Sequence, residues 1–210
     1  MLEELPEETF SSPAYRLANK GDYTITLAEM GIDAVGVEEI LSLLKEGGMT
    51  GTPDEYLDGP FKYRPFHRAD KTRFSDGSFR VFYSSLEPET AKAEAEHYNL
   101  RCLLGDASGS RTIYFQIIQC AFSGVIKDLR AHLARWPFLI EDDAYDRCNR
   151  IGGEAHASGL DGLLAQSARK VAGTNLPVFK RDSLSNPEIR GSCAFEFDPI
   201  SKAISMHPFA

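Results

Sequence analysis

The longest apolar stretch of the chain runs from Tyr114 to Ile126 and is interrupted by Gln116, Gln119 and Ser123. A stretch of this length is too short to cross a bilayer as a helix. Residues 111–122, RTIYFQIIQCAF, are instead typical of one long β-strand. We therefore expect a strand-containing domain with no membrane-spanning segment.

Helices and strands are expected to mix without a regular alternation. Helices are predicted at residues 35–44, 87–100, 125–134 and 145–156, from helical spacing, Pro88 near a helix start, or acidic first turns. Strands are predicted at residues 23–28, 79–84, 111–122, 162–164, 177–180 and 194–197, and residues 46–60, rich in Gly and Pro, are predicted as a loop. This order favours an α+β fold with a mixed, mostly antiparallel sheet and flanking helices.

Size and charge limit the classes of protein to consider. With 210 residues, 42% of them hydrophobic, we expect a single domain over residues 1–210, in which residues 1–13 form an extended acidic arm. The net charge of −8 disfavours binding to a nucleic-acid backbone. The four cysteines show neither zinc-ligand nor disulfide spacing, and no signal peptide is recognised, so a cytoplasmic location is expected.

Common nucleotide and hydrolase motifs are absent from the sequence. There is no G-x-G-x-x-G, no G-x-x-x-x-G-K-[ST], no G-x-S-x-G and no H-E-x-x-H. Asp142, Asp143 and Asp146 fit the acidic start of a helix better than a metal site, so no metal is expected. A bound dinucleotide would have to be held without a Rossmann turn or a P-loop.

Four segments carry the residues with the clearest functional pattern. They are AYRLANK at residues 14–20, TRFSDGSFRVFYSS at residues 72–85, EPETAKAEAEHY at residues 87–98 and GLDGLLAQSARKVAGTNLPVF at residues 159–179. In this order and spacing they resemble the RES family, which is named for its Arg, Glu and Ser. The matching positions are Tyr15, Arg16, Arg73, Asp76, Gly77, Tyr83, Thr90, Ala91, Glu94, Ser167, Asn175 and Phe179.

The resemblance implies a core at residues 14–180 with a fold similar to ADP-ribosylating toxins, and NAD⁺ as substrate. It also implies a toxin of a toxin–antitoxin pair that cleaves the nicotinamide–ribose bond and depletes NAD⁺, with an antitoxin protein as partner. Two other functions stay open: mono-ADP-ribosylation of a cellular protein, and nucleotide binding without catalysis.

The expected roles follow from the chemistry of NAD⁺ cleavage. Arg16 and Arg73 are candidates to bind the pyrophosphate bidentately. Arg64 or Arg68 could take the place of Arg16. A carboxylate such as Glu94 can stabilise the cationic ribose that forms as nicotinamide leaves.

Smaller roles are expected for the remaining candidates. Ser167 can hold Glu94 or the ribose, and Tyr83 can stack on a ring of the substrate. Tyr15, His67 and Asn175 are expected to line the same pocket. Without the family pattern, Glu94 would be one more charge on an exposed helix and each arginine a solvated surface residue.

Overall fold

The computed structural model describes residues 2–19, 31–46, 52–62, 71–105, 111–142 and 145–209. The predicted strand at residues 23–28 lies outside these ranges. Within them the chain forms an α+β fold, as the sequence predicts.

Seven strands form one sheet in the order β1-β2-β5-β4-β3-β6-β7. They are β1 (Glu8–Asn19), β2 (Phe82–Ser85), β3 (Arg111–Asp128), β4 (Gly162–Gln166), β5 (Thr174–Val178), β6 (Leu184–Asp198) and β7 (Ala203–Phe209). All pairs are antiparallel except β3 with β4. Because β1 also pairs with β3, the pairings of β1, β2, β5, β4 and β3 form a closed circuit, from which β6 and β7 extend.

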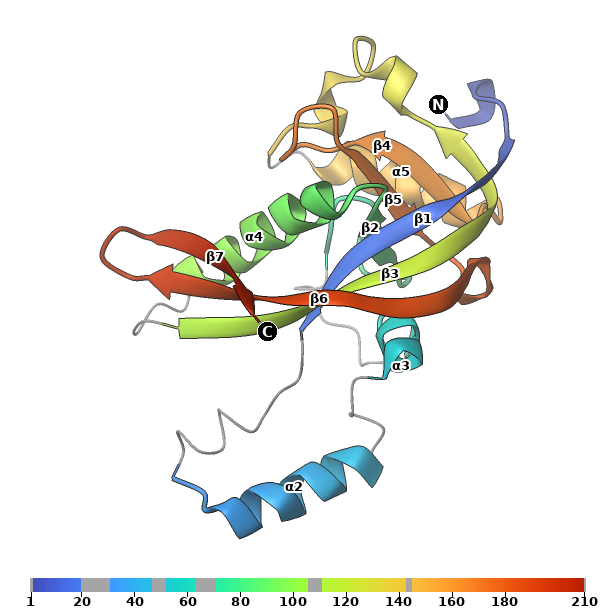
Figure 1. The fold of residues 1–210 in the computed structure, drawn as a ribbon. Helices are drawn as coiled ribbons and strands as arrows, with labels where there is room; N and C mark the ends of the chain where they lie inside the picture. The colour runs from blue at the N-terminus through green and yellow to red at the C-terminus, as the bar shows by residue number, and fades with distance from the viewer. Residues whose placement is uncertain are drawn as a thin grey trace.

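The helices lie around this sheet (Figure 1). They are α2 (Ala34–Glu46), α3 (Pro53–Asp58), α4 (Pro88–Gly105) and α5 (Tyr145–Ala157), together with the short 3₁₀ helices η1 (Leu2–Glu4), η3 (Arg130–His132), η4 (Pro137–Leu139) and η5 (Arg181–Ser183). Helix α4 contacts β1, β2 and β5, while α5 packs against β4. Helix α2 lies apart from the sheet in Figure 1.

Three predicted elements need correction. Residues 8–13 belong to β1 and pair with β3, so they are not a separate arm. The loop predicted over residues 46–60 contains helix α3, whose Thr52 and Glu55 form a capping box followed by Pro53. The helix predicted over residues 125–134 is wrong, because β3 continues through Val125 to Asp128 and only a short 3₁₀ turn follows.

The apolar core is divided into three clusters by the sheet. One lies around α5 and includes Phe74, Trp136, Ile151 and Leu163. A second includes residues of β1, β2, β3 and β5 together with Leu57 of α3. The third lies under α4, where Ala91 packs with Leu17, Phe115 and Phe195. Helix α4 thus packs against the sheet through Ala91 and Ala95. Because these side chains are small, the helix lies close to the sheet and contacts β5.

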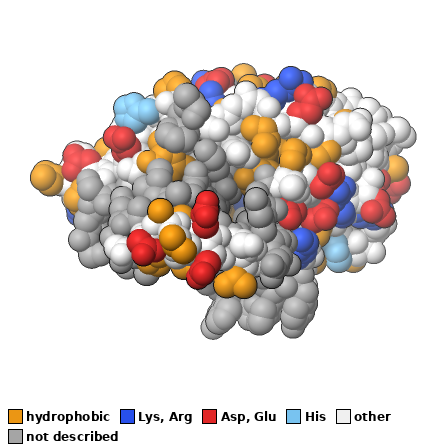
Figure 2. Space-filling view, turned by 60° about the horizontal axis from the view of Figure 1, so that its bottom comes forward, with side chains coloured by type: hydrophobic (Ala, Val, Ile, Leu, Met, Phe, Trp, Pro, Cys, Tyr) orange, Lys and Arg blue, Asp and Glu red, His pale blue; other side chains and the backbone are white. Residues whose placement is uncertain are grey.

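The surface of the described residues carries charges of both signs. On the face shown in Figure 2, Lys and Arg side chains are interspersed with Asp and Glu. In the part of the chain that the structure describes, no helix is both long and apolar enough to span a membrane.

Candidate active site

The start of α4 explains the spacing of its functional residues. Thr90 is buried and donates a hydrogen bond of 2.7 Å to Glu87, just before the helix. Ala91 packs toward the sheet in the third cluster. Glu94 follows Thr90 by four positions, so both side chains lie on the same face of the helix. That face is turned toward the connection between β4 and β5.

The β4–β5 connection is tied to the start of α4. The backbone N–H of Thr174 donates to Glu87 Oε2 at 3.0 Å, and the N–H of Leu86 donates to the Thr174 carbonyl at 2.9 Å. Gly173 lies so close to Thr90 that a Cβ added at Gly173 would be 2.4 Å from Thr90 Oγ1. Only glycine allows this approach without a shift of the neighbouring chain. The connection that carries Ser167 is therefore held at a fixed distance from the helix that carries Glu94.

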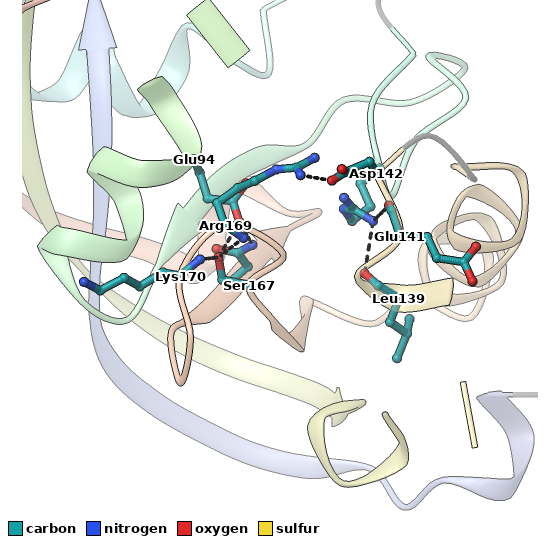
Figure 3. A network of polar contacts seen from close by, with 9 residues as sticks. Glu94, Leu139, Glu141, Asp142, Ser167, Arg169 and Lys170 are labelled. Atoms are coloured by element: carbon teal, nitrogen blue, oxygen red, sulfur yellow. Dashed lines mark hydrogen bonds and ion pairs between the residues drawn. The ribbon is translucent and has the colours of Figure 1, made fainter. Parts of the chain in front are cut away.

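Glu94, Ser167 and Asn175 meet in one hydrogen-bonded group. Ser167 Oγ donates to Glu94 Oε1 at 2.7 Å, and Asn175 Nδ2 donates to the same oxygen at 2.6 Å. Asn175 in turn accepts a hydrogen bond of 2.9 Å from Ser85 Oγ of β2. Figure 3 shows Glu94 approaching Ser167 from α4. Two parts of the chain that are far apart in the sequence, α4 and residues 167–175, thus meet at one carboxylate.

This arrangement leaves one carboxylate oxygen available. Both described hydrogen bonds of Glu94 go to Oε1, and Oε2 has no hydrogen-bond partner among the residues that the structure describes. Two donors on one oxygen fix the orientation of the carboxylate. Glu94 is partly buried. A carboxylate held in one orientation can stabilise a cation that develops beside it.

Ser167 is placed as a supporting residue. Its Oγ donates to Glu94 and accepts the backbone N–H groups of Arg169 at 3.1 Å and Lys170 at 3.0 Å. A serine nucleophile needs a base that accepts its proton and is itself oriented by a third group. The partner of Ser167 is instead the Glu94 carboxylate, so the serine orients this carboxylate.

Arg73 lies in a neighbouring group of contacts. Its Nη1 donates to the carbonyls of Leu139 at 3.1 Å and Glu141 at 2.8 Å, and its guanidinium lies 4.8 Å from the centre of the Tyr145 ring. Arg73 therefore fixes the segment before α5, and its contacts are not with Glu94.

Arg16 and Tyr83 are joined through β2. Arg16 Nη1 donates to the Tyr83 carbonyl at 2.8 Å, and the guanidinium lies 5.1 Å from the Phe82 ring. Burial lowers the pKa of Arg16 to about 10, although nearby Tyr98 of α4 opposes this shift. The Tyr83 hydroxyl contacts Thr72 Oγ1 at 2.6 Å and accepts the Phe74 N–H at 2.8 Å. These two side chains hold β1, β2 and the 72–75 turn together.

Of the other predicted site residues, the structure describes some and not others. Tyr15 pairs with Ser85 across β1 and β2, and its ring packs in the third cluster near α4. His67, Arg64 and Arg68 lie outside the described residues. Over the described ranges, no group of three or more His, Cys, Asp or Glu side chains could hold a metal.

Sequence reasoning missed the role of Arg169 and Asp142. Arg169 Nη1 forms an ion pair with Asp142 Oδ1, and these residues come from separate elements (Figure 3). Asp142 was expected only to favour the start of a helix. The one available signal was the position of Arg169, two residues after Ser167.

Comparison with known proteins gives a matching family and solved structures of similar fold. The family described as RES domain matches residues 50–198, which is more than half of the chain. The matched range contains Arg73, Glu94, Ser167 and Asn175, but not Arg16. The crystal structure of the M. tuberculosis MbcT–MbcA toxin–antitoxin complex is similar over 93% of this chain and 89% of that chain, with a TM-score of 0.49 and 15% identity. No curated protein matches the chain.

Proposed function

The chain belongs to the RES domain family, and from this premise we propose that it cleaves the bond between nicotinamide and ribose in NAD⁺. The observation that carries the proposal is the Glu94 carboxylate, which Ser167 and Asn175 hold at Oε1 while Oε2 makes no hydrogen bond to the described residues. Membership of the family supports NAD⁺ as the substrate. The geometry of the Glu94 carboxylate supports its role in stabilising the ribosyl cation.

The leaving group in NAD⁺ needs little acid catalysis. The pyridinium ring is already positive, so nicotinamide departs as a neutral molecule and takes the electron pair of the C–N bond. The positive charge passes to the ribose, which becomes oxocarbenium-like, as in glycoside cleavage. A carboxylate beside the anomeric carbon stabilises that charge more than it stabilises the ground state, and this lowers the barrier. Glu94 Oε2 is the group that we assign to this role.

Water or phosphate completes the reaction. Attack of water on the ribosyl cation forms ADP-ribose and releases one proton. Attack of phosphate forms ADP-ribose 1″-phosphate. Neither acceptor needs the Ser167 hydroxyl as a nucleophile. In both cases the protein's contribution is to position the ribose and stabilise its charge, with Ser167 and Asn175 as the residues that orient Glu94.

The products test the proposal. The purified full chain is incubated with NAD⁺ in water, in phosphate buffer and with a cell lysate, and products are separated by chromatography. Release of nicotinamide with ADP-ribose or its phosphate supports the proposal. Transfer of labelled ADP-ribose to a lysate protein would replace it with ADP-ribosyltransferase activity. Binding of NAD⁺ without release of nicotinamide would leave only a nucleotide-binding module.

We also propose that this activity is toxic and is neutralised by an antitoxin protein, as membership of the family suggests. Depletion of NAD⁺ in the cytoplasm would arrest growth on expression, and the Glu94→Gln variant would not. Growth arrest by both proteins would contradict a toxicity that depends on catalysis.

A further inference from the structure

Arg169 is connected to the proposed catalytic carboxylate through Ser167. The backbone N–H of Arg169 donates to Ser167 Oγ, and the same oxygen donates to Glu94. The base of the Arg169 side chain is therefore linked to Glu94 by two hydrogen bonds, of 3.1 Å and 2.7 Å. In Figure 3 the side chain extends from this turn toward Asp142.

The Arg169 guanidinium is buried, but its partner is not. Its side chain is only 10% exposed, whereas that of Asp142 is 72% exposed. One nitrogen, Nη1, contacts Asp142, and the guanidinium makes no other hydrogen bond to the described residues. A buried arginine normally uses several of its five donors. Within the described residues, only Nη1 of Arg169 is used, by Asp142.

Asp142 is an exposed carboxylate that forms an ion pair with Arg169. The hydrogen bond from Arg169, followed by the charges of Arg169, His97 and Arg73, holds the pKa of this carboxyl below its usual value. The segment before Asp142 is fixed by Arg73, through the carbonyls of Leu139 and Glu141. An exposed carboxylate is thus presented to a buried arginine beside the proposed site.

We propose that Arg169 binds a phosphate group of the substrate, and that Asp142 occupies its guanidinium until the substrate displaces it. This inference rests on the proposed function. The guanidinium binds phosphate oxygens bidentately, and a diphosphate carries more charge than a single carboxylate, so substrate can displace Asp142. Exposure of Asp142 lets its side chain turn into solvent when displaced. Arg73 acts here as a positioning residue for Asp142.

The test compares KM and kcat for nicotinamide release from NAD⁺ in wild type, Asp142→Asn and Arg169→Gln. The Asp142→Asn variant removes the competing charge, so KM is expected to fall about threefold or more. Asp146→Asn is the matched control, because Asp146 is also an exposed carboxylate in an ion pair, with Lys71. Its KM is expected to equal that of wild type.

Arg169→Gln is expected to raise KM about tenfold or more, with kcat close to wild type, because a charge-assisted contact with substrate is lost. Arg169→Lys, which keeps the charge, should recover part of this loss. Calorimetry with ADP-ribose checks the same order of affinities without turnover. A lower kcat at unchanged KM would assign Arg169 to the support of Ser167 and overturn the inference.

The outcomes separate this inference from the proposed function. If wild type cleaves NAD⁺ but Asp142→Asn leaves KM unchanged or raises it, the inference fails and the proposed function stands. If Arg169→Gln does not fold, the Asp142→Asn comparison alone decides. If wild type releases no nicotinamide, the proposed function fails and this inference fails with it.

Discussion

Ser167 donates a hydrogen bond of 2.7 Å to Glu94 across 73 positions of sequence. The bond joins the β4–β5 connection to α4 and fixes one oxygen of the carboxylate. Asn175 donates to the same oxygen at 2.6 Å. The orientation of Glu94 is therefore set by one side chain from the β4–β5 connection and one from β5, and the proposed chemistry depends on this orientation.

Ser167→Ala is expected to lower kcat for nicotinamide release by about 10–100-fold, because a hydrogen bond to a charged group is lost. The variant also removes the acceptor for two backbone N–H groups, so the turn at residues 167–170 loosens. Steady-state kinetics measure the effect. Ser158→Ala is the control, because Ser158 is exposed and its hydroxyl donates to the Glu154 carbonyl on α5. Equal activity of both variants would remove Ser167 from the site.

Gly173→Ala is expected to lower the free energy of unfolding by about 1–3 kcal/mol, because its Cβ would overlap Thr90. Activity should fall as well, since the Ser167 turn moves relative to α4. Combining it with Thr90→Ala relieves the overlap, so the double variant should lose less stability than the sum of the two single losses. Urea denaturation measures all three, and simple additivity would show that these residues do not contact one another.

Gly152 and Gly153 provide a matched pair on α5. A Cβ at Gly152 would lie 1.9 Å from the Phe74 carbonyl oxygen, whereas a Cβ at Gly153 would meet nothing within 4 Å. Gly152→Ala should therefore lower the melting temperature strongly, because backbone must move. Gly153→Ala should raise the free energy of unfolding by about 0.5–1 kcal/mol, from helix propensity alone. Similar thermal unfolding of the two variants would contradict the packing of α5 on the 72–75 turn.

Asp161 should make the stability depend on pH at the acid end. Burial opposes ionisation of this carboxyl, but hydrogen bonds from the Val125 N–H, Lys180 and Ser183 outweigh burial and lower its pKa. A pKa lowered by folding stabilises the protein above the unfolded value, about 4, and this contribution is lost as pH falls through the folded value.

Asp161→Asn is therefore expected to cost about 1–3 kcal/mol in the free energy of unfolding at pH 7. The difference from wild type should shrink steadily as the pH falls below about 4. Denaturation at a series of pH values measures it. A difference that is constant from pH 7 to pH 3 would mean that the charge of Asp161 does not contribute.

Local sequence patterns indicate several helices and the position of Glu94 in the site. Thr90, Ala91 and Glu94 have helical spacing. On α4, Thr90 lies against Gly173 and Ala91 packs on the sheet. Glu94 accepts a hydrogen bond from Ser167. Helix α3 also had local signals, because Thr52, Pro53 and Glu55 are typical of a helix start. The Gly- and Pro-rich surroundings led to a loop prediction instead.

Other features depend on tertiary contacts that no local pattern contains. Val125 and Ile126 continue β3 because they pair with Thr9 and Glu8 of β1, so strand pairing overrides a short helix-like pattern. The contact between Asp142 and Arg169 joins two segments whose proximity follows from the packing of α5 and β4. Arg16 and Arg73 were predicted as substrate ligands from their charge, and their direct role in binding stays a prediction.

The most direct test of the central claim is kcat for nicotinamide release from NAD⁺ by Glu94→Gln, compared with Glu96→Gln on the same helix. Both changes replace a carboxylate with an amide of the same shape, but Glu96 is exposed. We predict that Glu94→Gln loses at least about 100-fold in kcat, as expected when a charge that stabilises the transition state is removed, while Glu96→Gln retains wild-type activity. Full activity of Glu94→Gln would contradict the claim that this carboxylate stabilises the ribosyl cation.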